Sequence, residues 1–355
     1  MAVEVVTVSS PEELQVFNAF PGSVYRGVFT APSFPIIDPA DPRRDRLFAR
    51  VEAQPFLAVH RGYAAGRIAA GVHTDERLRT TGYFGYFEAL PDPAVAVALI
   101  DRASVWLAGR GAKVMTGPVD LTPHERVGLL VEGFKGFHLP GMPYNPPYYQ
   151  ALLKASGLQQ EMDLLAYHCD LRKPLPVRLV KVATRAMNNQ TLRIRELDFN
   201  NLTAEGEKFS CLHNGSMQGI WGFAPLSPEE GTAVLSRLKG FYDPGLILIA
   251  EVDEKPAGLC LTLLALRRNS GGALAGPRTA RLAVLAVLPP FRFKGLEAAL
   301  IIECIRRAVR RGVMRFEFSQ IAESNRMMNK IIQNTGQARK GRVYRVYRKT
   351  LFDSQ

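Results

Sequence analysis

The hydrophobic positions in the second half of the chain follow two periods, one typical of strands and one typical of helices. Alternating or continuous apolar stretches predict six strands, over residues 191–197, 246–252, 256–266, 280–288, 313–319 and 341–351. Apolar residues spaced three and four apart predict four helices, over residues 200–213, 227–239, 295–311 and 325–334. The predicted order along this half is β-α-α-β-β-β-α-β-α-β.

The first half of the chain repeats that order. Its predicted strands cover residues 3–8, 55–59, 63–72, 82–90, 112–117 and 161–169. Its predicted helices cover residues 11–20, 42–53, 93–110 and 147–156. Short identities recur at matching places, such as Ala98-Leu99-Ile100 in the first half and Ala299-Leu300-Ile301 in the second. The shared order and these identities predict an internal duplication.

The composition is typical of an ordered globular protein. The chain has 355 residues, of which 47% are hydrophobic and 22% are charged, and this excludes a disordered or fibrous chain. No apolar run of about 18 residues is present, so we expect no membrane span. The N-terminus lacks the basic segment of a secretion signal, and the four cysteines lack the spacing of metal ligands. We therefore expect a cytoplasmic protein without a bound metal, and the oligomeric state stays open.

The net charge is +12, and nearly all of it lies in the last sixth of the sequence. Residues 292–349 hold fifteen basic side chains and four acidic ones. One interpretation is an anionic partner: a phosphate-bearing cofactor, an acidic carrier protein or a nucleic acid such as tRNA. The other is a solvent-exposed helix face and a charged edge strand, which need no partner.

The junction between the strand at 280–288 and the helix at 295–311 has the clearest chemistry. Its sequence Arg292-Phe293-Lys294-Gly295 places two cations and a glycine just before the helix. Unpaired backbone N–H groups and the positive end of a helix dipole suit a pyrophosphate. An ordinary strand-to-helix turn with surface cations is the alternative.

This junction resembles the acyl-CoA loop of the GNAT (N-acetyltransferase) superfamily. That loop begins with Gln or Arg, has Gly three residues later and ends with a small residue. Arg292 and Gly295 match it, while Glu297 replaces the small residue. The resemblance implies that acetyl-CoA or another acyl-CoA binds here as the donor. The residues implied to contact it are Leu288, Arg292, Phe293, Lys294, Gly295, Leu296, Glu297 and Asn325.

A second pattern of the same superfamily is present in altered form. Asn325, Ile331 and Gly336 keep its spacing, and Met328 replaces its alanine. Ile332 stands where many members have a tyrosine that protonates the leaving CoA thiolate. The resemblance therefore leaves open which group protonates the thiolate in this chain.

The resemblance extends over both halves as a tandem GNAT protein, and points to a bacterial group with near copies of MPYNPPYY, residues 142–149. It implies an α/β fold of two GNAT-like domains, each a mostly antiparallel twisted sheet flanked by helices. We expect a first domain over 1–172, a linker with a short helix over 173–190, and a second domain over 191–355. Residues 90–97 lack glycine, arginine and lysine, so we expect the cofactor in the second domain only.

Candidate substrate-binding side chains lie in a proline-stiffened loop and after the first helix of the second domain. They are Tyr144, Asn145, Tyr149, Asn214, Trp221 and Phe223, joined by Glu125 from the adjacent pair His124-Glu125. Prolines fix the loop backbone, so little entropy is lost in presenting its side chains. Packing in a domain seam or core is the alternative for these residues.

Two residues are candidates for proton transfer. Glu317 alternates with phenylalanines on the strand at 313–319, and it is a candidate general base toward an amine or a partner for an arginine. Tyr344 is a candidate replacement for the missing tyrosine acid.

The resemblance implies an acyltransferase that moves an acyl group from acyl-CoA to an amine-type small-molecule acceptor. An acidic carrier protein or an aminoacyl-tRNA is the alternative donor, which the basic C-terminal sixth favours. A protein that binds CoA or a metabolite without catalysis is the third possibility, because Ile332 and Glu297 depart from the family pattern.

Overall fold

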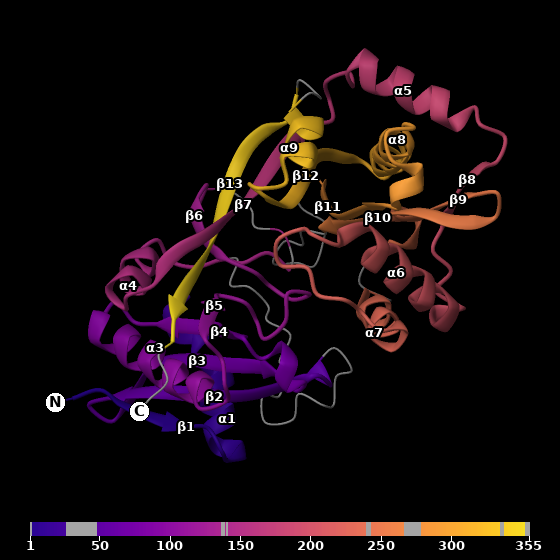
Figure 1. Cartoon of the computed structure of the whole chain (residues 1–355). Helices are drawn as coiled ribbons and strands as arrows, with labels where there is room; N and C mark the ends of the chain where they lie inside the picture. The colour runs from indigo at the N-terminus through magenta and orange to yellow at the C-terminus, as the bar shows by residue number, and fades with distance from the viewer. Residues whose placement is uncertain are drawn as a thin grey trace. The chain divides into compact units, whose positions relative to one another are not determined.

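The structure is a computed structural model of the chain, and it describes residues 2–25, 48–135, 139, 141–238, 243–265, 278–333 and 337–351. Contacts divide the chain into two compact units. Unit 1 combines Met1–Leu164 with Arg342–Gln355, and unit 2 is Leu165–Gly341. Each unit carries helices packed on a sheet (Figure 1).

Unit 1 is built on a mixed sheet with the strand order β1-β2-β3-β4-β5-β13, and β6 also pairs with β13. The strands are β1 (Glu4–Thr7), β2 (Val51–His60), β3 (Tyr63–His73), β4 (Thr81–Ala89), β5 (Val114–Gly117), β6 (Leu129–Glu132) and β13 (Arg339–Thr350). The recorded pairings among them are antiparallel, except that β4 and β5 run parallel. The residues of β13 from Arg342 onward therefore lie in the sheet of unit 1.

In the described residues of unit 1, four helices pack on this sheet. They are α1 (Pro11–Ala19), α2 (Pro21–Val24), α3 (Pro93–Ala108) and α4 (Tyr149–Ala155), with a 3-10 turn at Glu76–Leu78. The N–H of Glu13 donates to Oγ of Ser10, and the Glu13 carboxylate accepts from the N–H of Ser10, which fixes the start of α1. Asp92 caps α3. The apolar face of α3 then buries Leu99 and Ile100.

Unit 2 is built on a second mixed sheet with the strand order β7-β12-β11-β10-β9-β8. The strands are β7 (Gln159–Asp170), β12 (Val313–Ala322), β11 (Arg278–Val287), β10 (Lys255–Ala265), β9 (Ile247–Val252) and β8 (Leu192–Glu196). The neighbours from β8 to β11 are antiparallel, whereas β11 and β12 run parallel. The residues of β7 from Leu165 onward belong to this unit.

In the described residues of unit 2, five helices accompany the sheet. They are α5 (Val177–Met187), α6 (Leu202–Met217), α7 (Pro228–Leu238), α8 (Leu296–Arg310) and α9 (Arg326–Gln333), with 3-10 turns at Pro244–Leu246 and Pro289–Phe291. α6 and α7 lie on one face, and α8, covered by α5, lies on the other (Figure 1). Leu300 and Ile301 of α8 join Phe316 and Phe318 of β12 in one core, where each buried side chain stabilises the fold by about 1.5–3 kcal/mol.

The order of elements predicted from the sequence is confirmed in the second half and, apart from two differences, in the described residues of the first half. The predicted helix over 42–53 is wrong at its end, because residues 51–53 pair with β3 and open β2; residues 42–47 lie outside the described residues. Strand β6 was not expected. The mixed α/β class, with a helix-flanked sheet in each half, is confirmed, and the domain boundaries at 172 and 191 stay a prediction. No described helix has both the length and the apolar character needed to cross a bilayer.

Candidate functional site

The two units share a local feature, a pair of parallel strands that separates after a few residues. In unit 1, β4 pairs with β5 from Thr81 to Tyr83. In unit 2, β11 pairs with β12 from Arg278 to Leu282. Strands that separate leave backbone donors and acceptors on their facing edges, and these groups need another partner.

The gap in unit 1 is filled by the chain itself. The N–H of Val119 donates to the carbonyl of Phe84 at 2.7 Å, and the N–H of Tyr86 donates to Oδ1 of Asp120 at 2.8 Å. Gly85 permits this approach, because a Cβ at its position would overlap the carbonyl oxygen of Val119. The segment around Val119 therefore occupies the edge of β4 beyond its pairing with β5.

Unit 1 also holds a buried polar cluster on β4. The buried carboxylate of Glu88 accepts hydrogen bonds from the hydroxyls of Tyr25 at 2.8 Å and Tyr149 at 2.6 Å. The buried guanidinium of Arg67 lies 4.9 Å from the ring centroid of Phe17. Burial raises the pKa of Glu88 and lowers the pKa of Arg67, while their opposite charges act in the reverse sense. A network of this kind specifies the packing of a core.

The predicted substrate residues of the MPYNPPYY loop have partners within unit 1. Oδ1 of Asn145 accepts from the N–H of Leu130 at 2.8 Å, and the Asn145 amide donates to the Leu130 carbonyl at 3.2 Å. The carbonyl of Tyr144 and the hydroxyl of Tyr149 are hydrogen-bonded in the polar cluster on β4. These contacts favour the packing alternative. Glu125, the other candidate in unit 1, is half-buried on a bend.

The gap in unit 2 leads to the predicted phosphate-binding loop. The pairing of β11 with β12 ends at Leu282. Beyond this residue, within the described part of the chain, β11 pairs only with β10. After a 3-10 turn the chain reaches Gly295, whose φ of +86° favours glycine and which immediately precedes α8. The N–H groups of Phe293, Lys294 and Gly295 have no recorded backbone acceptor among these residues. The positive end of the α8 dipole lies at the same point.

A surface hollow of about 810 Å³ lies beside this loop. Its lining comes from α5 and the loop: Val177, Arg178, Lys181, Val182, Arg185, Phe293, Lys294 and Gly295. Four of these residues are cations and none is acidic, and no ion pair is recorded for the four within the described ranges. Phe293 is 85% exposed and Val177 is 69% exposed. Positive charge next to apolar surface suits a ligand that combines phosphates with a ring.

Packing holds α5 against this loop. Ala183 of α5 clusters with Ala298 and Ile302 of α8. A Cβ added at Gly295 would lie 3.1 Å from Cγ1 of Val182 on α5. The cations of α5 are therefore held next to the loop. Reasoning from the sequence missed α5 as part of the site, although the absence of acidic residues from 171 to 190 was a visible signal.

Arg292, predicted to contact the cofactor, supports the loop from within. Its guanidinium donates to the carbonyl of Val287 at 3.0 Å and to the carbonyl of Ser216 at 2.8 Å. It therefore ties the loop to the end of α6. Leu288, half-buried, donates its N–H to the carbonyl of Ala257 on β10.

The other predicted cofactor residues lie in α8 and at the start of α9. Leu296 is buried in the core, and Glu297 is half-buried in the first turn of α8. The side chain of Asn325 caps α9. Ile332, at the usual tyrosine position, is fully buried in the core of unit 2. Gly336 lies outside the described residues.

The last turn of α6 and the connection from α6 to α7 carry the predicted acceptor residues of unit 2. Asn214 holds the connection, donating to the carbonyl of Leu226 at 2.8 Å and accepting from its N–H at 2.9 Å. The ring of Phe223 stacks on His213 at 5.7 Å between centroids. Burial lowers the pKa of His213. Trp221 is half-buried on the same connection, so these side chains form one ordered segment.

The two candidates for proton transfer belong to different units. Glu317 is fully buried, with Oε2 3.3 Å from Nδ1 of His168 and Oε1 accepting from Oγ of Ser319 at 2.6 Å. Tyr344 is also fully buried and belongs to unit 1. Reasoning from the sequence missed His168, because only the order of strands brings it opposite Glu317.

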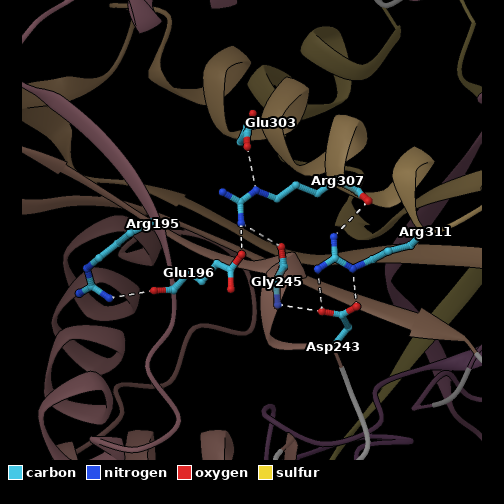
Figure 2. A network of polar contacts seen from close by, with 7 residues as sticks. All are labelled: Arg195, Glu196, Asp243, Gly245, Glu303, Arg307 and Arg311. Atoms are coloured by element: carbon cyan, nitrogen blue, oxygen red, sulfur yellow. Dashed lines mark hydrogen bonds and ion pairs between the residues drawn. The ribbon is translucent and has the colours of Figure 1, made fainter.

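Ion pairs neutralise part of the positive charge counted over residues 292–349. Arg307 binds Glu303 at 2.7 Å and Glu196 at 2.6 Å, and Arg311 forms a two-point ion pair with Asp243 (Figure 2). Two further pairs join cations of β13 to acids of unit 1, Arg345 to Asp163 and Lys349 to Asp101. The excess of cations over 292–349 is therefore partly balanced by acids from elsewhere in the chain. In the described residues, no three His, Cys, Asp or Glu side chains gather in a metal-binding arrangement.

Part of the chain matches the model of a known family, and the whole chain is similar to two bacterial proteins. A model of the acetyltransferase (GNAT) family matches residues 212–332, from α6 to α9. Protein YghO of Escherichia coli (strain K12) is 29% identical to the chain and covers 97% of it and 95% of its own length. The bacterial ceramide synthase of Caulobacter vibrioides (strain NA1000 / CB15N) is 28% identical and covers 98% of both chains.

Solved structures show the same architecture. A tandem GNAT protein from the clavulanic acid biosynthesis pathway is similar with a TM-score of 0.59 at 12% identity, covering 99% of this chain and 100% of that one. The expectation of two GNAT-like domains in tandem is thus confirmed as a fold. The link to a particular group marked by MPYNPPYY stays a prediction.

Proposed function

We propose that this chain is an acyltransferase that moves an acyl group from acyl-CoA to the nitrogen of an amine-type small molecule. The observation that carries the proposal is the loop at Gly295, where backbone N–H groups and the start of α8 adjoin a hollow lined by cations. The match of the GNAT family model across this region supports it.

The loop and the hollow suit the nucleotide end of CoA. The N–H groups of residues 293–295 would bind the pyrophosphate, as helix N-termini do. The cations Arg178, Lys181 and Arg185 of α5 would bind the 3′-phosphate, and the exposed ring of Phe293 would stack on adenine.

The acyl arm would run along the edge of β11 that β12 leaves. From Val287 back to Leu282 the strand spans about 17 Å at roughly 3.3 Å per residue. This length is of the order of an extended pantetheine arm, whose amides can bond to an open strand edge. The thioester would then lie near the point where β11 and β12 separate.

The acceptor is proposed to be an amine. A ceramide is a long-chain amine that carries an N-acyl group, so the name of the Caulobacter relative denotes acyl transfer to nitrogen. We extend this class of acceptor to the chain, with Trp221 and Phe223 on the connection between α6 and α7 as its contacts.

Catalysis would come mainly from positioning the amine against the thioester, with backbone N–H groups polarising the carbonyl. Ile332 offers no proton to the leaving thiolate and is buried in the core, so solvent would protonate the thiolate.

Titration calorimetry with matched donors tests this proposal. We expect acyl-CoA to bind, and dephospho-CoA to bind at least about tenfold more weakly, since it lacks the phosphate that α5 would hold. The variant Lys181→Ala/Arg185→Ala should remove this difference. The control Lys255→Ala changes an exposed lysine at the start of β10 and should behave like the wild type.

Calorimetry together with a turnover assay separates the alternatives. No acyl-CoA binding at millimolar concentration would sink the proposal. Turnover only with an acyl-carrier protein or an aminoacyl-tRNA would support the alternative donors. Binding of acyl-CoA without turnover across a panel of short and long amines would support a protein that binds the cofactor without catalysis.

A further inference from the structure

We propose that His168 accepts the proton lost by the amine during acyl transfer and that Glu317 positions its imidazole. This inference rests on the proposed acyl transfer and assigns its proton-transfer residues. It starts from a row of side chains on three neighbouring strands of unit 2, with His168 on β7, Glu317 on β12 and Arg281 on β11.

The exposure of the two side chains decides their roles. Glu317 is fully buried, so it is poorly placed to meet an acceptor directly, whereas the His168 side chain is 39% exposed. Nδ1 of His168 lies 3.3 Å from Oε2 of Glu317. With the Nδ1 proton directed at this carboxylate, Nε2 is the nitrogen that would accept the proton in the proposed step.

The other carboxylate oxygen of Glu317 is also hydrogen-bonded. Oγ of Ser319 donates to Oε1 of Glu317 at 2.6 Å, and Nε of Arg281 donates to Oγ of Ser319 at 3.0 Å. The chain from Arg281 to His168 therefore fixes the orientation of the imidazole, which general-base catalysis requires.

The pair lies where the two parallel strands separate. Arg281 of β11 is in register with Glu317 of β12, and the next pair, Leu282 with Phe318, is the last before the gap. The proposed path of the acyl arm along β11 ends at the same place. The imidazole is on β7, with β12 between its strand and β11, and it reaches this place through its contact with Glu317 of β12.

Gly341 on β13 fits the imidazole closely. A Cβ at this position would overlap Cδ2 and Nε2 of the His168 ring. Any side chain here would displace the edge of the ring that carries the proton acceptor, so this glycine offers a second way to test the assignment.

The step balances without an added reagent. The amine nitrogen forms a C–N bond to the acyl carbon, and the C–S bond of the thioester breaks. The proton that leaves nitrogen goes to Nε2 of His168, and the imidazolium then releases it to solvent. The CoA thiolate takes a proton from solvent, so amide and free thiol are the products.

The test is chemical rescue. His168→Ala should lower kcat by about 10²–10⁴-fold, the usual contribution of a general base, and leave acyl-CoA binding by calorimetry unchanged. Added imidazole should restore a large part of the lost rate. Glu317→Gln should lower kcat about tenfold or more with little change in the donor KM. The control His60→Ala removes another histidine near a carboxylate, 3.9 Å from Asp92 in unit 1, and should keep full turnover.

The outcomes separate the two proposals. Full turnover by His168→Ala, or a loss that imidazole does not restore in a folded variant with normal donor binding, overturns the assignment of His168. If His168→Ala does not fold, Gly341→Ala replaces it, and wild-type kcat in that variant overturns the assignment. Failure of the wild type to bind acyl-CoA overturns the proposed function instead.

Discussion

In both units a pair of parallel strands separates, but the strand edge that this leaves is used differently. In unit 1, Gly85 lets the segment around Val119 bond to β4, so the chain closes its own gap. In unit 2, the described residues place no such segment along β11, and the strand leads to the loop at Gly295. One small residue and a few backbone bonds thus suffice to fill the space between separating strands in unit 1. With the donor site proposed for unit 2, the two units would share an architecture but not a binding site.

The surface hollows of the two units also differ, in the balance of charged side chains that line them. A hollow of about 580 Å³ in unit 1 is lined by Glu52, Glu76, Arg79 and Arg110, and its cations form ion pairs with its acids. The hollow of unit 2 holds cations without acids in its lining. Cations that are paired with acids in the same hollow attract an anionic ligand only weakly. A hollow lined by cations without acids attracts such a ligand more strongly.

The largest effect should come from Gly295, which precedes α8 in the loop proposed to bind phosphate. In Gly295→Val, a side chain would strain the φ of +86° and push against Val182. We expect the affinity for acyl-CoA to fall about a hundredfold or more, so that the number of molecules bound per chain falls from one to none. Gly62→Val in unit 1 matches it, with φ +79° and open space around its Cβ position. That control should cost about 1–2 kcal/mol of stability and leave donor binding intact. Equal binding by both variants, or two sites in the wild type, would break the comparison.

The polar cluster of unit 1 should affect stability but not binding. Tyr149→Phe leaves the buried carboxylate of Glu88 without one of its donors, and should lower the free energy of unfolding by about 1–2 kcal/mol. Denaturation by urea measures this change. Tyr63→Phe, at a tyrosine that is 79% exposed, is the control and should change nothing. A loss of acyl-CoA affinity in Tyr149→Phe would show that unit 1 takes part in binding.

A pH-dependent effect should appear in unit 2. Burial lowers the pKa of His213 in the folded state below its unfolded value, which is about 6.5. As the pH falls through that value, the unfolded chain binds the proton first, so the free energy of unfolding should decrease. Unfolding curves between pH 8 and 5 test this. His213→Gln should flatten the dependence, and an unchanged slope in that variant would contradict the assignment.

The smallest effect should come from the ion pairs of the basic segment. A double-mutant cycle on Asp243 and Arg311, which are both partly buried, should give a coupling energy of about 0.5–1 kcal/mol. The pair Asp170–Arg172, with Arg172 67% exposed, should give a smaller coupling. The reverse order would show that the basic segment is not held by the contacts of Figure 2.

Local patterns in the sequence predicted most of the elements and the glycine before α8, and the family resemblance predicted the fold, whereas the contacts of the site depended on distant residues. The order of elements and the glycine at 295 are readable because periodicity and turn chemistry act within a few residues. His168 and Glu317 meet only because β7 and β12 are neighbours, and this order is not written in either segment. Arg292 was expected to contact the cofactor, and the sequence did not show that its guanidinium also donates to the backbone carbonyls of Val287 and Ser216. The charge count over 292–349 likewise overlooked acids such as Asp243.

The position of β13 has a consequence for the order in which the protein can be made. Its residues pair with β5 and β6, so the sheet of unit 1 receives this strand only after all of unit 2 has been synthesised. Closing so long a stretch of chain is slow, and until then β5 and β6 lack a hydrogen-bonding neighbour that they have in the finished sheet. A nascent first unit would therefore wait with an unpaired strand edge, and a chaperone that covers such edges would have its substrate there.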